Sequence, residues 1–148
     1  MEKNEKLIVV RIWGDVKLNP DTRMTFRLLG LKKKFWCTIV DNSGEKMGML
    51  KKVQEGICYG KANADVLKEM IIKRAKTGKK QAKIEEKKVD DFVKKFMEGK
   101  GKMSELGINN VFALHPPRGG FKKSSKLLYP KGILGKNEKV NELISRMI

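Results

Sequence analysis

The chain has 148 residues, a length that fits one ordinary domain or a small domain with an added lobe. Lys and Arg number 34 against 17 Asp and Glu, so the formal net charge is +17 and the pI is near 10.0. A protein this cationic repels itself in the compact state, and a polyanionic partner would relieve that repulsion. The candidate partners are nucleic acid, an anionic membrane surface and an acidic protein. The sequence has no run of 18 apolar residues, so no membrane-spanning helix is expected.

Cysteine and histidine are too few for a zinc site of the usual kind. Cys37 and Cys58 do not form a CxxC pair, and His115 is the one histidine. Both cysteines have apolar neighbours, so we expect buried thiols in a reducing compartment. The apolar stretch near the N-terminus is too short for a signal peptide, and the sequence therefore indicates a cytoplasmic protein.

The first 61 residues alternate strand and helix patterns. Residues 7–13, 35–40 and 57–59 are short, apolar and rich in β-branched or aromatic side chains, as strands are. One helix is predicted to start at residues 19–21, with Asn as N-cap and Pro in the first turn, and another to contain residues 47–53. This β-α-β-α-β order predicts an α+β fold with a ferredoxin-like core, whose helices act as crossovers on one face of a small sheet.

Helical spacing predicts which side of the first helix is buried. Met24, Leu28 and Leu31 recur on one face, so Leu28 is expected to pack against the core. Gly30 is a natural stop for this helix, because glycine readily adopts the left-handed conformation that ends many helices.

The rest of the chain, residues 62–148, is predicted to be an extension appended to a core formed by residues 1–61. Helices are expected at 63–71, at 90–97 and at the C-terminal end, where the inner side is formed by Val140, Leu143, Ile144 and Met147. A short strand is expected at residues 111–114.

Two segments of this extension show no clear period. Residues 76–88 are rich in Lys and are predicted to be an exposed linker or basic arm. Residues 122–137 are basic and contain glycine, and no regular element is predicted there.

Three groups of residues are candidate phosphate contacts. No acidic residue interrupts the first group, and Gly48 of the second is expected at a helix entry, where backbone amides bind anions. The third lies in a segment without acidic residues, whose Gly-Gly pair permits close approach to a ligand and whose Arg can bind phosphate through a planar fork. The groups are Arg23, Arg27, Lys32, Lys33 and Lys34; Lys46, Gly48, Lys51 and Lys52; and His115, Arg118, Gly119, Gly120, Lys122, Lys123 and Lys126.

Each group also has a plainer interpretation, namely a solvated basic face, a helix cap with ordinary surface lysines, or a loop. A catalytic role for His115 lacks a neighbouring carboxylate, Cys or Ser in a recognisable motif. The nucleotide-binding and nucleophile-elbow motifs are absent as well. Sequence-specific DNA binding is not favoured, because the sequence contains neither a zinc finger nor a basic region joined to heptads. Positive charge spread over several segments is better suited to a folded RNA.

The chain resembles the large-subunit ribosomal protein thirty family in its archaeal form, which is related to eukaryotic large-subunit protein seven. The resemblance covers nearly the whole chain and is most specific at residues 48–53, Gly-Met-Leu-Lys-Lys-Val, and 111–122, which contain His-Pro-Pro-Arg-Gly-Gly-Phe-Lys. Residues 7–12, 29–31, 132–135 and 141–144 also resemble the family.

The resemblance implies a structural constituent of the large ribosomal subunit that binds and stabilises large-subunit rRNA beside neighbouring ribosomal proteins, without catalysis, a cofactor or a small-molecule substrate. It also implies that Lys46, Lys51 and Lys52, and Arg118 with Lys122 and Lys123, contact rRNA.

Two stretches depart from the family pattern, the Lys-rich residues 76–88 and residues 41–44, where the family often has a Pro-containing loop. The sequence also lacks the basic N-terminal extension of eukaryotic members, which favours an archaeal source.

Overall fold

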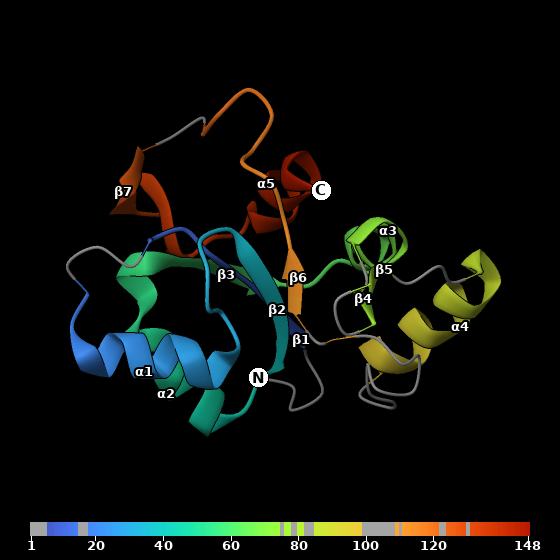
Figure 1. Ribbon diagram of the computed structural model, residues 1–148, viewed down its shortest axis with the longest axis horizontal. Helices are drawn as coiled ribbons and strands as arrows, with labels where there is room; N and C mark the ends of the chain where they lie inside the picture. The colour runs from blue at the N-terminus through green and yellow to red at the C-terminus, as the bar shows by residue number, and fades with distance from the viewer. Residues whose placement is uncertain are drawn as a thin grey trace.

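A computed structural model of the chain describes residues 6–14, 18–74, 76–77, 80–81, 85–98, 109, 111–121, 124–129 and 131–148. Its main sheet has six strands in the order β6-β2-β1-β3-β8-β7. Helices cover both faces of this sheet, with α1 and α2 on one side and α3 and α4 on the other (Figure 1). The expected α+β fold class is confirmed.

Strand β1 (Lys6–Arg11) lies inside the sheet and pairs antiparallel with β2 (Trp36–Asp41) and β3 (Ile57–Lys61). All six of its residues are buried, and their side chains alternate between two cores. Leu7 and Val9 join one core, while Ile8 and Val10 join the other. A strand covered on both faces needs apolar residues at consecutive positions, which explains the unbroken run at residues 7–10.

The first core lies under α1 (Pro20–Leu29) and α2 (Gly44–Lys52). Both helices cover one face, as expected. Helix α2 is a crossover, because it joins β2 to β3, which are both antiparallel to β1 and therefore parallel to each other. Helix α1 is not a crossover of this kind, because it joins the antiparallel neighbours β1 and β2. Asn19 caps α1 by accepting a hydrogen bond from the Asp21 amide, and Gly30 ends the helix in the left-handed conformation, with φ of 83°.

The predicted buried face of α1 is wrong. Phe26 and Leu29 are buried, whereas Met24 is 53% exposed and Leu28 is 67% exposed. Two apolar stripes run along this helix, and the spacing alone does not rank them. The stripe that faces the core is the one formed by Phe26 and Leu29. Leu31 is also buried, but it lies beyond the end of the helix at Gly30.

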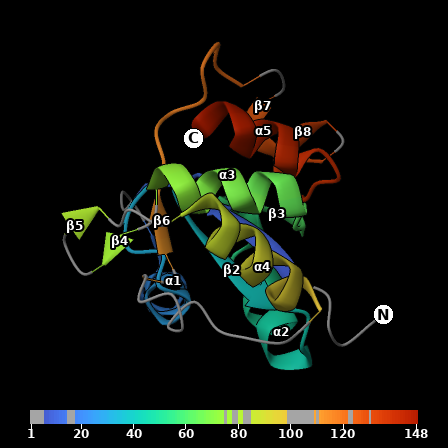
Figure 2. The ribbon, with the colours of Figure 1, turned by 90° about the vertical axis from the view of Figure 1, so that its right-hand side faces the viewer.

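The second core is larger and lies under α3 (Ala64–Arg74), α4 (Glu86–Met97) and α5 (Val140–Met147). Figure 2 views the molecule from this side and shows α3 between α4 and α5. The four inner residues predicted for α5 are all buried. Helix α4 begins four residues earlier than predicted, because Val89 adds a turn to the apolar face formed by Phe92, Val93 and Phe96.

Both segments without a clear period contain strands. Residues 76–77 and 80–81 form β4 (Lys76–Thr77) and β5 (Lys80–Gln81), a two-stranded antiparallel pair. The linker alternative is therefore wrong at these positions, whereas the basic-arm alternative stays a prediction. Strands β7 (Ser124–Leu128) and β8 (Gly132–Lys136) were not predicted. They are too short and too rich in Lys, Ser and Gly to show an alternating pattern. The sequence also predicts one helical turn at residues 103–106, a segment that lies outside the described residues.

The main sheet therefore takes strands from both sides of residue 61. Strand β8 pairs in parallel with β3, and β6 (Val111–Ala113) pairs antiparallel with β2, as expected for a strand at residues 111–114. Gly60 lets the residues before α5 approach β3, because a Cβ at this position would lie 2.5 Å from the Asn137 carbonyl oxygen. The division into residues 1–61 and 62–148 stays a prediction.

The two cysteines are free buried thiols, as expected. Cys37 and Cys58 lie on β2 and β3, on either side of Val10 in the register. Burial raises the pKa of both thiols, that of Cys58 to about 12, and the neighbouring Cys58 raises the pKa of Cys37 further. Since the thiolate is the reactive form, both side chains are chemically inert in the folded protein.

The exposure of Leu28 gives a stability prediction. Leu29→Ala leaves a cavity in the first core and should lower the free energy of unfolding by ~2–5 kcal/mol. Leu28→Ala removes a side chain that is 67% exposed and should change it by less than ~0.5 kcal/mol. Urea denaturation of the two variants measures the difference, and equal losses would mean that both stripes of α1 are packed.

The buried thiols give a second prediction. A disulfide reagent such as dithiobis(nitrobenzoic acid) should modify neither Cys37 nor Cys58 in the native protein at mildly alkaline pH. It should modify both thiols after denaturation in guanidinium. Rapid modification before unfolding would contradict the burial of this pair.

Candidate nucleic-acid interface

Helix α1 and the loop after it form one continuous basic surface. Arg23, Arg27 and Lys32–Lys34 are all exposed, which places the whole first predicted group on the outside of the molecule. Arg23 and Arg27 are one helical turn apart and therefore lie on the same side of α1. Residues 20–52 contain eight Lys and Arg against three Asp and Glu, so this side of the sheet carries an excess of positive charge.

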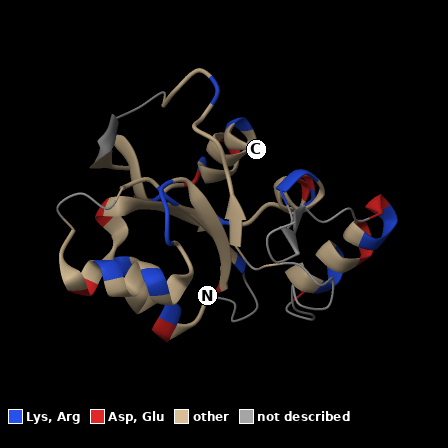
Figure 3. Ribbon diagram, in the orientation of Figure 1, with Lys and Arg blue, Asp and Glu red and all other residues tan. Residues whose placement is uncertain are grey.

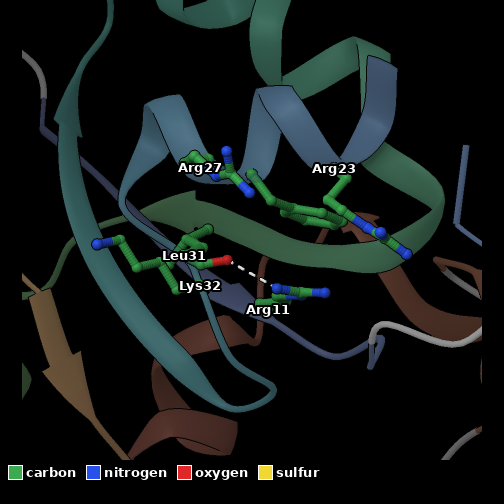
Figure 4. A pocket seen from close by; sticks show the side chains of 6 residues that line it. Arg11, Arg23, Arg27, Leu31 and Lys32 are labelled. Atoms are coloured by element: carbon green, nitrogen blue, oxygen red, sulfur yellow. Dashed lines mark hydrogen bonds between the residues drawn. The ribbon is translucent and has the colours of Figure 1, made fainter. Parts of the chain in front are cut away.

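A basic hollow of about 290 Å³ opens beside α1 and is lined by Arg11, Arg23, Phe26, Arg27, Leu31 and Lys32. Figure 4 shows Arg23 and Arg27 extending from the same side of α1, Arg11 across the opening on β1, and Lys32 extending away from Arg23. Among the described residues that line it, four are cationic and none is acidic. The cationic groups are spread along the opening and do not converge on one point.

Arg11 is only 1% exposed, and contacts with the surrounding chain hold its side chain in place. Its Nε donates to the Trp13 carbonyl oxygen and its Nη1 donates to the Leu31 carbonyl oxygen, each at 2.8 Å. The guanidinium also lies 4.2 Å from the centroid of the Phe26 ring, within the range of a cation-π contact. Arg11 is not among the predicted phosphate contacts, and the signal for it in the sequence is a charged residue that interrupts an apolar strand.

The loop that carries Lys32–Lys34 is joined to a second segment through aromatic residues. Phe35 adopts a positive φ of 66°. Its amide donates a hydrogen bond to the Arg11 carbonyl oxygen, and its carbonyl oxygen accepts one from the Leu114 amide. The Phe35 ring is 6.3 Å from that of Phe121, and Lys34 Nζ lies 5.0 Å from the Phe35 centroid. Phe121 is thus half-buried against the fold.

The segment 115–121, here called the arm, is fixed to the end of α5. The His115 amide donates to the Met147 carbonyl oxygen, and the Arg118 amide donates to that of Arg146. Arg146 Nη1 in turn donates to the carbonyl oxygens of Arg118 and Gly120, the latter at 2.7 Å. These hydrogen bonds from the end of α5 hold the backbone of the arm in place.

The polar groups of the arm nevertheless face outward. His115, Arg118, Gly119 and Gly120 are exposed, whereas Pro117 is buried. Gly119 and Gly120 have φ of 79° and 72°, values that disfavour other residues, and a Cβ at either position would meet open space. The arm therefore presents bare backbone beside an Arg side chain.

The second predicted group lies on α2 but not as expected. Ser43 caps this helix by accepting from the Lys46 amide, so the free amides of its first turn lie near Gly44. Gly48 lies in the middle of the helix, and the prediction that it stands at the helix entry is wrong. Gly48 is exposed with open space beside it, and Lys51 and Lys52 are exposed at the end of the helix.

The structure does not bring all three groups together. Helices α1 and α2 lie on the same side of the sheet, whereas the arm passes beside α5 (Figure 1). Of the third group, Lys122 and Lys123 lie outside the described residues, and Lys126 is described only as a backbone position in β7.

Charge is distributed unequally between the two helical layers (Figure 3). Two lysines on the α3–α4 side have acidic partners, since Lys68 pairs with Asp90 at 2.7 Å and Lys73 pairs with Glu69 at 3.1 Å. Opposite charges this close reduce the attraction of that side for a polyanion. The α1–α2 side is therefore the better surface for phosphate.

Within the described ranges, no three His, Cys, Asp or Glu side chains gather as metal ligands. The helices of that same part of the chain are all too short or too polar to cross a membrane.

The arm gives a paired prediction. Arg118→Ala should leave the melting temperature nearly unchanged, because the exposed side chain is separate from the backbone bonds that fix the arm. Arg146→Ala removes the donor to two arm carbonyls and should lower it by several degrees. Thermal unfolding followed by circular dichroism tests both. A large loss for Arg118→Ala would make that residue structural.

Comparison with known proteins identifies the relatives of this chain. The family model described as ribosomal protein L30p/L7e matches residues 7–57. The chain is 37% identical to large ribosomal subunit protein uL30 of Staphylothermus marinus, over 95% of this chain and 96% of that protein. It is 33% identical to the uL30 of Archaeoglobus fulgidus and 35% identical to that of Cenarchaeum symbiosum, each over at least 94% of this chain and 97% of the relative.

Proposed function

The chain belongs to the uL30 family of large ribosomal subunit proteins, and from this premise we propose that it is a non-catalytic constituent of that subunit in the cytoplasm. It binds folded large-subunit rRNA and stabilises its arrangement. The relatives are archaeal proteins matched along nearly their whole length, so the chain is of the archaeal type.

The observation that carries this proposal is the one-sided excess of cations on α1, the following loop and α2. Arginine and lysine side chains that neutralise phosphates release the counterions condensed on RNA, and this release drives association. On the α3–α4 side, by contrast, Lys68 and Lys73 have carboxylate partners of their own. RNA accordingly approaches from the α1–α2 side, and the remaining surface is available for contacts with neighbouring ribosomal proteins.

Within this function, the predicted site residues have different parts. Arg23, Arg27 and Lys32–Lys34 contact phosphates beside α1, and Lys46, Lys51 and Lys52 contact them beside α2. Gly48 offers a helix surface without a side chain, where an RNA backbone can come close. In the arm, Arg118 and the exposed Gly119–Gly120 backbone form a separate contact, which includes His115 and continues to Lys122, Lys123 and Lys126.

The division of the chain follows the same reasoning. Residues 1–61 form the core that carries the α1–α2 surface, and residues 62–148 add the second helical layer, the arm and the outer strands. The extension covers the face of β1 that α1 and α2 leave open.

Salt dependence of rRNA binding tests the proposal. With ~6–10 phosphates neutralised, affinity for deproteinised large-subunit rRNA should fall by ~10³–10⁵ between ~50 and ~200 mM salt. Lys51→Gln/Lys52→Gln should reduce the slope of log affinity against log salt by about two. The same two-charge change on α4, Lys94→Gln/Lys95→Gln, is the matched control and should leave the slope unchanged.

Two results would contradict the proposal. One is wild-type binding that does not change with salt, and the other is an equal effect of the α2 and α4 variants. A free regulatory RNA-binding module is the second hypothesis, and sedimentation separates it from a ribosomal protein, because the latter stays with large subunits after a moderate-salt wash.

A further inference from the structure

The basic hollow beside α1 has features that phosphate neutralisation alone does not require. A surface that merely attracts RNA can carry mobile lysines anywhere, because the attraction is long-ranged and independent of geometry. Here three of the four cationic residues are arginines, and Arg11 is immobilised by two backbone carbonyls and the Phe26 ring. Arginine offers a rigid planar fork that matches phosphate oxygens, whereas lysine acts as a point charge.

A second observation lies on the same helix. Met24 and Leu28 are exposed and one turn apart, so they form an apolar stripe next to the Arg23–Arg27 stripe. The backbone of an RNA duplex would leave this apolar stripe uncovered. An unpaired nucleotide, by contrast, can turn its base or ribose toward apolar side chains while its phosphates remain beside the arginines.

We propose that the basic hollow and the adjacent Met24–Leu28 stripe together bind an unpaired segment of the RNA strand. Its phosphates lie along the opening between Arg23, Arg27 and Lys32, and one of its bases or riboses covers Met24 and Leu28. Arg11 is a positioning residue, which holds Phe26 and the chain at Leu31 so that the opening keeps its shape. The inference rests on the proposed rRNA-binding function and specifies the structure of RNA that this one surface recognises.

Charge-conserving substitutions separate this site from a general basic surface. Arg23→Lys/Arg27→Lys keeps the net charge but removes both planar forks. We expect it to weaken binding to deproteinised large-subunit rRNA at least tenfold at constant salt, with little change in the salt slope. Lys94→Arg/Lys95→Arg on α4 is the control, which also conserves charge at two exposed positions outside the RNA surface and should bind like the wild type. Unchanged affinity of the Arg23→Lys/Arg27→Lys protein would overturn the proposal.

The apolar stripe is tested by Met24→Gln/Leu28→Gln. Both positions are exposed, so the variant should fold with a wild-type melting temperature, and thermal unfolding verifies this first. Its affinity for rRNA should fall severalfold. If affinity for rRNA stays at the wild-type level, the stripe is not an RNA contact and the proposal is wrong. Reduced retention of such a protein in assembled subunits would then assign the stripe to a neighbouring protein.

Nucleotide reactivity shows whether the bound RNA is unpaired. Acylation of 2′-hydroxyl groups marks flexible nucleotides, and binding of the wild-type protein should protect a short run of them. The Arg23→Lys/Arg27→Lys and Met24→Gln/Leu28→Gln proteins should leave the same run reactive. Protection of paired regions alone would overturn the proposal. Wild-type protein that fails to bind rRNA at all would instead contradict the proposed function, which keeps the two failures distinguishable.

Discussion

Burial of β1 on both faces is the constraint on which the rest of the structure depends. Every residue of this strand is buried, and its side chains alternate between two cores. Apolar surface on both sides of the sheet requires a helical layer on each, so the outer faces of the helices become most of the surface of the protein. The excess of cations therefore lies on helices and loops whose inner faces are already used for packing.

The two helical layers differ in what they do with their charges. On the α3–α4 side, carboxylates pair with lysines, and the charge is partly neutralised within the protein. On the α1–α2 side, carboxylates are sparse, so the electrostatic cost of the compact state is relieved by an external polyanion. Fold and function are thus linked by the sidedness of the charge, and the buried Arg11 contributes by supporting the opening on that side.

The sequence predicts those elements whose pattern is set by one strong local signal. The Asn19 cap, the Gly30 stop and the inner face of α5 are confirmed, because capping groups and a single apolar stripe leave little choice. Leu28 was placed wrongly because α1 has two apolar stripes, and the choice between them depends on packing with a sheet far away in sequence. Strands β7 and β8 were missed because their pairing, and not their composition, stabilises them.

The candidate site is predictable in the same uneven way. Exposed cations such as Arg27 and Lys32 follow from composition, whereas the hollow between them requires the position of Arg11 on a different element.

The side of the protein that faces rRNA is measured most directly by cross-linking protein side chains to rRNA in purified large subunits, followed by mass spectrometry. The account predicts cross-links at Lys32, Lys51 and Lys52, and few at Lys94 and Lys95. Cross-links concentrated on the α4 lysines would contradict it.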